Sequence, residues 1–111
     1  MRPAARLRRS TDIAAVRAEG RSLRRSAFNA RVRRTDQPLS RLAVTAPRTV
    51  GTAVKRNRAR RRVREAFRRV FASASPGRSI DLLITVRPEA ARADFPAIEA
   101  DVRALLVELA R

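Results

Sequence analysis

The sequence predicts an α+β fold, a single compact sandwich in which three helices pack on a central, mostly antiparallel sheet of about four strands. Three observations predict it. The length of 111 residues fits one domain. Apolar residues alternate with period two in segments 28–32, 42–46 and 80–86, as in strands. They recur with the helical period in segments 52–74 and 95–109. The expected order is helix, strand, strand, helix, strand, helix, without an internal repeat or a linker.

The first expected element is a short helix over Thr11–Glu19. Ser10 can cap it, because a serine oxygen accepts a hydrogen bond from a free backbone N–H at a helix start. Asp12 is favourable in the first turn, where the helix dipole is positive. Gly20 is a plausible stop. Residues 1–9 are basic and are expected to form a flexible arm.

Two strands are expected next, close enough in sequence to pair as a hairpin. The first buries Phe28 and alternates through residue 34, and the second covers 42–46. The segment between them contains Asp-Gln-Pro at 36–38, which favours a turn. A further short edge strand is possible at Arg21–Arg25.

The longest periodic stretch, 52–74, predicts a helix that ends within Ser73–Gly77. On a helical wheel its apolar residues fall on one core-facing stripe, which consists of Ala59, Val63, Ala66, Phe67, Val70, Phe71 and Ala74.

The chain ends with a strand and a helix. The run Ile80–Val86 is so apolar that it predicts a central strand, with Leu83 on the opposite face from its neighbours. Asp94 is expected to cap the last helix, which we expect to cover the far side of the sheet. The apolar stripe of that helix consists of Phe95, Ile98, Val102, Leu105, Leu106 and Leu109.

Charge is concentrated in the first two thirds of the chain. The formal net charge is +17. Residues 1–78 hold 23 basic and 4 acidic side chains, whereas residues 79–111 hold 4 basic and 6 acidic ones. Repulsion among so many like charges opposes a compact fold, so we expect a polyanionic partner that neutralises them. Nucleic acid is the obvious candidate, because neutralising its phosphates releases condensed counterions. A surface charged only for solubility would usually mix signs.

Several classes are excluded by composition. The chain has no Cys and no His, which removes disulfide scaffolds, thiolate zinc sites and imidazole catalysis. No apolar run is long enough to span a membrane, and the N-terminus lacks the apolar core of a secretory signal. We therefore expect a cytoplasmic protein without a membrane association.

The segment VGTAVKRNRARRRVREAF at 50–67 carries the chemistry. Gly51 allows a tight bend, and the helix start behind it offers free N–H groups that attract phosphate. Arg56 and Arg60 project near the apolar stripe, so we expect the helix start to face an open groove rather than a closed core. Asn57 is mildly unfavourable within a helix. It can contact RNA, orient neighbouring arginines or remain a solvated amide, and the chemistry leaves these open.

This segment resembles the signature of the protein subunit of bacterial ribonuclease P. In that family a Gly and a short apolar stretch precede Arg-Asn-Arg, basic pairs and an Arg-x-Ala-Phe ending. The flanking strings RLRRSTDIAAV and RPEAARADF also resemble the family's opening helix and the approach to its last helix. The resemblance implies a left-handed βαβ crossover, which the general preference for right-handed connections would not predict.

The resemblance also implies a function. A catalytic RNA subunit would remove the 5′ leader of precursor tRNA by endonucleolytic cleavage. Mg²⁺ would be held mainly by that RNA and the substrate, and the protein would bind both RNAs without needing another protein. No catalytic or metal-ligating residue is expected in this chain, because the few carboxylates of the basic half are not paired at helical spacing. The expected RNA-binding residues are Arg48, Lys55, Arg56, Asn57, Arg58, Arg60, Arg61, Arg62, Arg64 and Arg68.

The resemblance also implies that a groove between the first helix and the sheet binds the single-stranded leader. By position it includes Ile13, Arg17, Asn29 and Arg31. Aromatic residues are common there in the family but absent at these four positions, so stacking on bases is lost. We therefore hypothesise that leader binding by this chain depends more on charge, and is more sensitive to salt, than is usual in the family. Arg62 also departs from the family, where an apolar residue is usual. It suggests extra RNA contact or a solvated flank.

The principal alternative is a ribosomal or other general structural RNA-binding protein. It would share the charge, size and fold class, but it would not share the ordered signature at 51–67.

Overall fold

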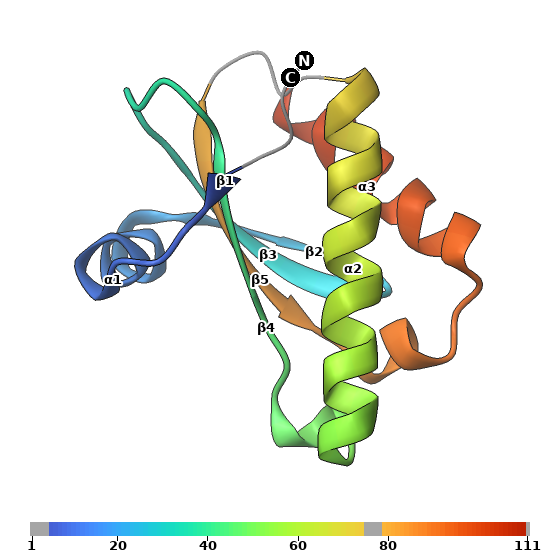
Figure 1. The fold of residues 1–111 in the computed structure, drawn as a ribbon. Coiled ribbons are helices and arrows are strands. Elements are labelled where there is room, and N and C mark those ends of the chain that lie inside the picture. The colour runs from blue at the N-terminus through green and yellow to red at the C-terminus, as the bar shows by residue number, and fades with distance from the viewer. Residues whose placement is uncertain (1–4, 75–78, 111) are drawn as a thin grey trace.

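The computed structural model describes residues 5–74 and 79–110. Over these residues the chain forms one sheet with helices on both faces (Figure 1). The strands are β1 (Ala5–Arg6), β2 (Arg21–Arg24), β3 (Phe28–Arg34), β4 (Arg41–Thr45) and β5 (Ile80–Val86). The helices are α1 (Ser10–Glu19), α2 (Ala53–Ser73) and α3 (Phe95–Leu109), with short 3-10 turns η1 (Arg48–Val50) and η2 (Pro88–Ala91). The predicted α+β class, the three helices and the optional edge strand are confirmed.

The sheet is mixed, with strand order β1-β4-β5-β3-β2. β2–β3 and β3–β5 are antiparallel, whereas β1–β4 and β4–β5 are parallel. The expected hairpin of β3 and β4 is therefore wrong, because β5 lies between them. β5 is buried on both faces along nearly its whole length. A hairpin of its two neighbours would have left this most apolar strand at a sheet edge, exposed to water.

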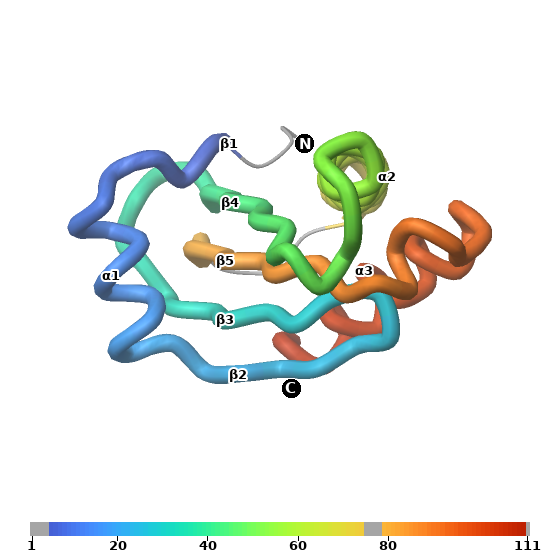
Figure 2. Tube along the Cα trace, turned by 90° about the horizontal axis from the view of Figure 1, so that it is seen from below, coloured from blue at the N-terminus to red at the C-terminus, as the bar shows by residue number. Residues whose placement is uncertain are grey.

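The connection from β4 through α2 to β5 is left-handed. Both strands run toward the viewer in Figure 2, and the chain passes from β4 above, through α2 at the right, to β5 below (Figures 1 and 2). This is the crossover that the resemblance implied. It places the start of α2 at the end of the sheet where β4 stops.

The larger core lies between the sheet and α2 with α3. Its centre includes Phe28 of β3 and Phe67 of α2, whose ring centroids are 5.4 Å apart. The predicted apolar stripe of α2 is confirmed, since its members from Ala59 to Phe71 are buried. Full burial of side chains of this size stabilises the fold by roughly 1.5–3 kcal/mol each.

A smaller core lies on the other face, under α1. Leu7, Val16 of α1 and Leu83 of β5 are buried there, with Ile13 packed against them. Leu83 thus points away from its neighbours, as predicted. The expectation that α3 covers the far side is wrong, because α3 shares a face with α2, and α1 is the one helix of the described residues that covers the far side (Figure 1). The stripe of α3 is apolar enough to complete the larger core, which one helix cannot cover.

The helix ends differ in detail from expectation. Ser10 is the first residue of α1 rather than its cap, and Arg9 precedes it without a side-chain capping bond. Asp94 does occupy the cap position of α3, but its side chain makes no capping bond. The prediction that α1 stops at Gly20 is confirmed. A Cβ at that position would lie 2.3 Å from the Val16 carbonyl oxygen, so only glycine fits. α2 ends at Ser73, the first residue of the predicted end, and residues 75–77 of that range lie outside the described residues.

Candidate nucleic-acid interface

The start of α2 is set by three neighbouring residues. Val50 is buried and anchors the turn η1 to the core. Gly51 follows with φ 133°, a left-handed conformation that favours glycine. The Thr52 hydroxyl oxygen then accepts a hydrogen bond from the Lys55 N–H at 3.3 Å, capping the helix. The basic segment is therefore held in one orientation against the sheet.

Most basic residues of α2 lie on its solvent side. Lys55, Arg58, Arg61 and Arg68 are exposed, as is Arg48 in η1. A further four are half-buried: Arg56, Arg60, Arg62 and Arg64. None of the predicted cations of this segment is enclosed in the core, in line with the expected open groove.

Most of these cations have no internal counter-charge. Among residues 5–74 and 79–110, the ion pairs of α2 involve only Glu65, which binds Arg68 and Arg69. Apart from Arg62, which hydrogen-bonds backbone carbonyls, the basic residues of α2 without an ion pair in that part of the chain are Lys55, Arg56, Arg58, Arg60, Arg61 and Arg64. We call these six the free cation row. Their charge is available to an external polyanion.

Asn57 orients a neighbouring arginine. Its side-chain oxygen accepts a hydrogen bond from a terminal nitrogen of Arg60, one helical turn further along. Of the three roles left open by the sequence, the structure shows the second. The bond holds the Arg60 guanidinium beside the amide instead of letting it move freely.

Arg62 points inward to the turn that precedes α3. Its Nη1 donates to the Ala90 carbonyl at 2.8 Å, and its Nη2 donates to the Ala93 carbonyl at 2.5 Å. Neither alternative offered by the sequence, RNA contact or a solvated flank, included this role. A direct RNA contact by Arg62 stays a prediction, and its guanidinium is already engaged within the fold.

Local charge affects the ionisation of two side chains of α2. Burial lowers the pKa of Arg64, and the positive charges of Arg6 and Arg60 lower it further. A hydrogen bond from Arg68 lowers the pKa of Glu65 to about 2, with further lowering by Arg69. The first effect shows like charges converging, and the second shows the one carboxylate of α2 committed to its arginines.

The predicted leader groove falls on the α1 face of the sheet. Arg31 donates from Nη2 to the Gly20 carbonyl at 3.1 Å, which places it under the end of α1. Asn29 is exposed on the same face of β3, two residues away. Ile13 and Arg17 line a shallow pocket of about 570 Å³ on α1. The strand residues do not line that pocket, so the four residues share a face without forming one closed cleft.

The strand register adds residues that the sequence did not single out. Thr45, Thr85 and Arg24 are these residues, and together with the predicted Asn29 they lie side by side across four strands. They form a polar row on the face that carries α1, beyond the buried Leu83. The sequence contained a signal for them, namely their place in the alternation. However, only the strand order shows that they are neighbours.

Comparison with known proteins gives the family. The ribonuclease P family model matches residues 1–110. This chain belongs to the ribonuclease P protein family. It is 40% identical over 107 residues to the ribonuclease P protein component of Chloroflexus aurantiacus, covering 96% of this chain and 78% of the relative. It is 36% identical over 106 residues to that of a Roseiflexus species, covering 96% and 86%.

Solved structures agree. The ribonuclease P protein of Thermotoga maritima superposes with a TM-score of 0.79 at 30% identity, covering 93% of this chain and 96% of that one. The Staphylococcus aureus protein shares the fold, with a TM-score of 0.77 at 22% identity, covering 97% and 96%. The chain is thus the protein component of ribonuclease P, a tRNA-processing ribonucleoprotein and endoribonuclease, and its partner is the RNA subunit. This favours the predicted function over a ribosomal or general structural RNA-binding protein.

Two further observations concern other parts of the prediction. No helix in the described ranges is long and apolar enough to cross a membrane. Over the same ranges, no three or more Asp or Glu side chains gather closely enough to hold a metal ion.

Proposed function

We propose that this subunit binds the catalytic RNA and the precursor tRNA, while the RNA cleaves the 5′ leader. The observation that carries the proposal is the free cation row. Six positive side chains lie on one helix, whose start is fixed by Gly51 and Thr52, and they have no ion-pair partner among the described residues.

The row suits RNA phosphates for two reasons. Guanidinium groups bind phosphate oxygens through two parallel hydrogen bonds. Each neutralised phosphate also releases condensed counterions, which favours binding at low salt. Because catalytic RNA and precursor tRNA are both polyanions, positive charge held between them lowers their repulsion. A protein acting in this way reduces the Mg²⁺ concentration that the RNA needs, with the ion held mainly by RNA and substrate.

The α1 face supplies the proposed leader contact. Arg17 is exposed there, and the Nε of Arg31 is buried with no hydrogen-bond partner among the described residues. Neither Arg17 nor Arg31 has an ion-pair partner among these residues, so both charges are available to an external anion such as a phosphate of a single strand. Ile13 and Asn29 add apolar and amide contact beside these charges.

The carboxylates near both surfaces are engaged by arginines. Asp12 pairs with Arg41 at 3.0 Å, and Glu19 pairs with Arg33 at 2.7 Å. Glu65 is held by Arg68. These groups are occupied as counter-ions, which supports a binding rather than a catalytic role for the protein.

Reconstitution tests this function. The purified chain is mixed with the ribonuclease P RNA of its own genome and a precursor tRNA at low Mg²⁺, with the chain alone and the RNA alone as references. We expect leader removal to be faster with both components than with the RNA alone, and the chain alone to be inactive. Leader removal by the chain alone would overturn the proposal, as would a complex no faster than its RNA.

A further inference from the structure

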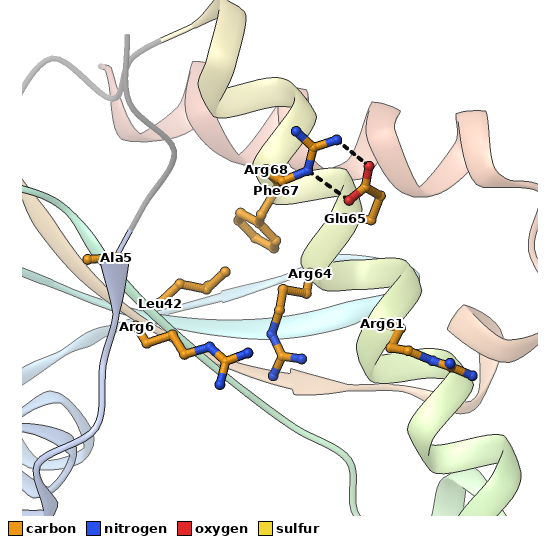
Figure 3. Close-up of a pocket in the computed structure, with 8 residues that line it drawn as sticks. All are labelled: Ala5, Arg6, Leu42, Arg61, Arg64, Glu65, Phe67 and Arg68. Atoms are coloured by element: carbon orange, nitrogen blue, oxygen red, sulfur yellow. Dashed lines mark hydrogen bonds and ion pairs between the residues drawn. The ribbon is translucent and has the colours of Figure 1, made fainter.

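A pocket of about 470 Å³ lies between α2 and the outer edge of the sheet. Arg6 of β1 and Leu42 of β4 line one side, and Arg61, Arg64, Phe67 and Arg68 of α2 line the other (Figure 3). The pocket is on the opposite face of the sheet from the leader groove. Arg6 lies beside Leu42 in the parallel pairing of β1 and β4, whereas the next residue, Leu7, packs under α1.

The pocket combines an apolar base with a positive rim. Leu42 and Phe67 are buried members of the larger core and close its inner end. The side chains of Arg6 and Arg64 reach toward one another across the opening (Figure 3). Arg68 is held at the rim by Glu65, whose oxygens accept from it at 2.8 and 2.5 Å. At the rim, Arg68 is therefore held in place by an ion pair, whereas the charges of Arg6 and Arg64 converge without a counter-charge.

Converging like charges are unfavourable without an anion between them. Arg6 and Arg64 have no ion-pair partner in the described part of the chain. The two side chains converge across the opening (Figure 3), and burial together with the positive charge of Arg6 lowers the pKa of Arg64. An anionic group placed between the two guanidinium groups would relieve this repulsion. A phosphate alone would leave the apolar inner end of the pocket unfilled.

We propose that this pocket takes one unpaired nucleotide of RNA. The base lies against Leu42 and Phe67, and its phosphate is bound between Arg6 and Arg64. The pocket volume falls in the range of small-molecule sites, about 300–1,000 Å³. A paired base would not enter, because its faces are stacked and its edges are occupied within the helix. This inference rests on the proposed function and assigns α2 a nucleotide site in addition to its phosphate contacts.

Nuclear magnetic resonance of the methyl-labelled full chain tests the site. The probes are adenosine 5′-monophosphate and, as a matched control without a base, ribose 5-phosphate. We expect the adenosine nucleotide to shift the Leu42 methyl resonances saturably and ribose 5-phosphate to leave them in place. Because Leu42 faces α2, nucleotide bound in the leader groove does not produce this signal.

Two variants distinguish nucleotide binding in this pocket from general electrostatic attraction to the chain. Arg64→Ala removes a charge-assisted hydrogen bond and should weaken the nucleotide about fivefold. Arg103→Ala, at an exposed position of α3, should leave affinity unchanged. Equal Leu42 shifts with both probes would show a phosphate-only site and overturn the proposal. No Leu42 shift up to about 10 mM nucleotide, a concentration that fills even weak sites, would also overturn it. Neither result affects the reconstitution test of the proposed function.

Discussion

Arg41 binds the buried carboxylate of Asp81 with two hydrogen bonds. Nε donates to Oδ1 at 2.8 Å, and Nη2 donates to Oδ2 at 2.6 Å. Asp81 is 0% exposed. The remaining terminal nitrogen of Arg41 donates to Asp12 of α1 at 3.0 Å. One guanidinium thus joins two neighbouring strands to the helix that borders the proposed leader groove, and it fixes how that helix sits on the sheet.

Removing Arg41 should destabilise the protein strongly. Arg41→Ala leaves the Asp81 carboxylate buried and unpaired, which costs about 3–5 kcal/mol. Asp12→Ala removes only the outer bond and should cost about 1 kcal/mol. Urea denaturation measures both free energies of unfolding. The interpretation fails if the two variants are destabilised to the same small extent.

Arg61 and Arg62 are adjacent in sequence but should behave oppositely. Arg62→Ala frees the Ala90 and Ala93 carbonyls, so we expect a loss of about 1–3 kcal/mol of stability. Arg61→Ala should leave stability unchanged and lower the slope of log affinity for the RNA subunit against log salt by about 1. Denaturation and salt-dependent binding measure the two effects. The opposite pattern would show that Arg62, not Arg61, contacts RNA.

The sequence predicted the type of each element and the burial of its residues better than it predicted which elements lie side by side. The periodicity of α2 and the apolar run of β5 were sufficient, because each reflects how much of a single element is buried and does not depend on which elements surround it. The order of strands was not predictable from alternation, since β3 and β4 are also spaced as a hairpin would be. The partners of Asp81 and Arg62 follow only from that order and from the packing of η2. For this reason one buried acid and one inward arginine were missed.

Candidate site residues were predictable to a similar extent. The residues of the free cation row were recognisable in the sequence from the ordered signature, and the helical periodicity predicted that they lie on one helix. The converging pair of Arg6 and Arg64 joins two segments nearly sixty residues apart, so only the fold reveals it.

Glu65 should titrate far below an ordinary glutamate. The hydrogen bond from Arg68 lowers its pKa to about 2 from 4.5. Because the folded pKa is depressed, the stabilisation is complete above pH 4.5 and is lost as the pH falls toward 2. Carboxyl-carbon resonances measured against pH give the midpoint. Arg68→Ala should raise the Glu65 midpoint, and a midpoint near 4.5 in the unaltered protein would contradict the pairing.

The leader contact should depend on salt through Arg17 and Arg31. The double variant Arg17→Ala/Arg31→Ala removes two cations facing a single strand, so the slope of log affinity against log salt should fall by about 1.4. Precursor tRNA binding to the holoenzyme, measured over a salt series, gives the slope. The control Arg92→Ala/Arg103→Ala changes charge equally in the acidic third of the chain. An unaltered slope for the first pair would contradict a leader contact based on charge.

The most direct test of the account removes charge from the free cation row and measures cleavage. Holoenzyme is assembled at low Mg²⁺ from the RNA subunit and either the Arg56→Ala/Arg58→Ala variant or the Arg92→Ala/Arg103→Ala control. Leader removal from precursor tRNA is then followed. We predict that the control accelerates cleavage as the unaltered protein does and that the first variant does not. Full acceleration by the Arg56→Ala/Arg58→Ala protein would contradict the central claim that this row docks the subunit on its RNA.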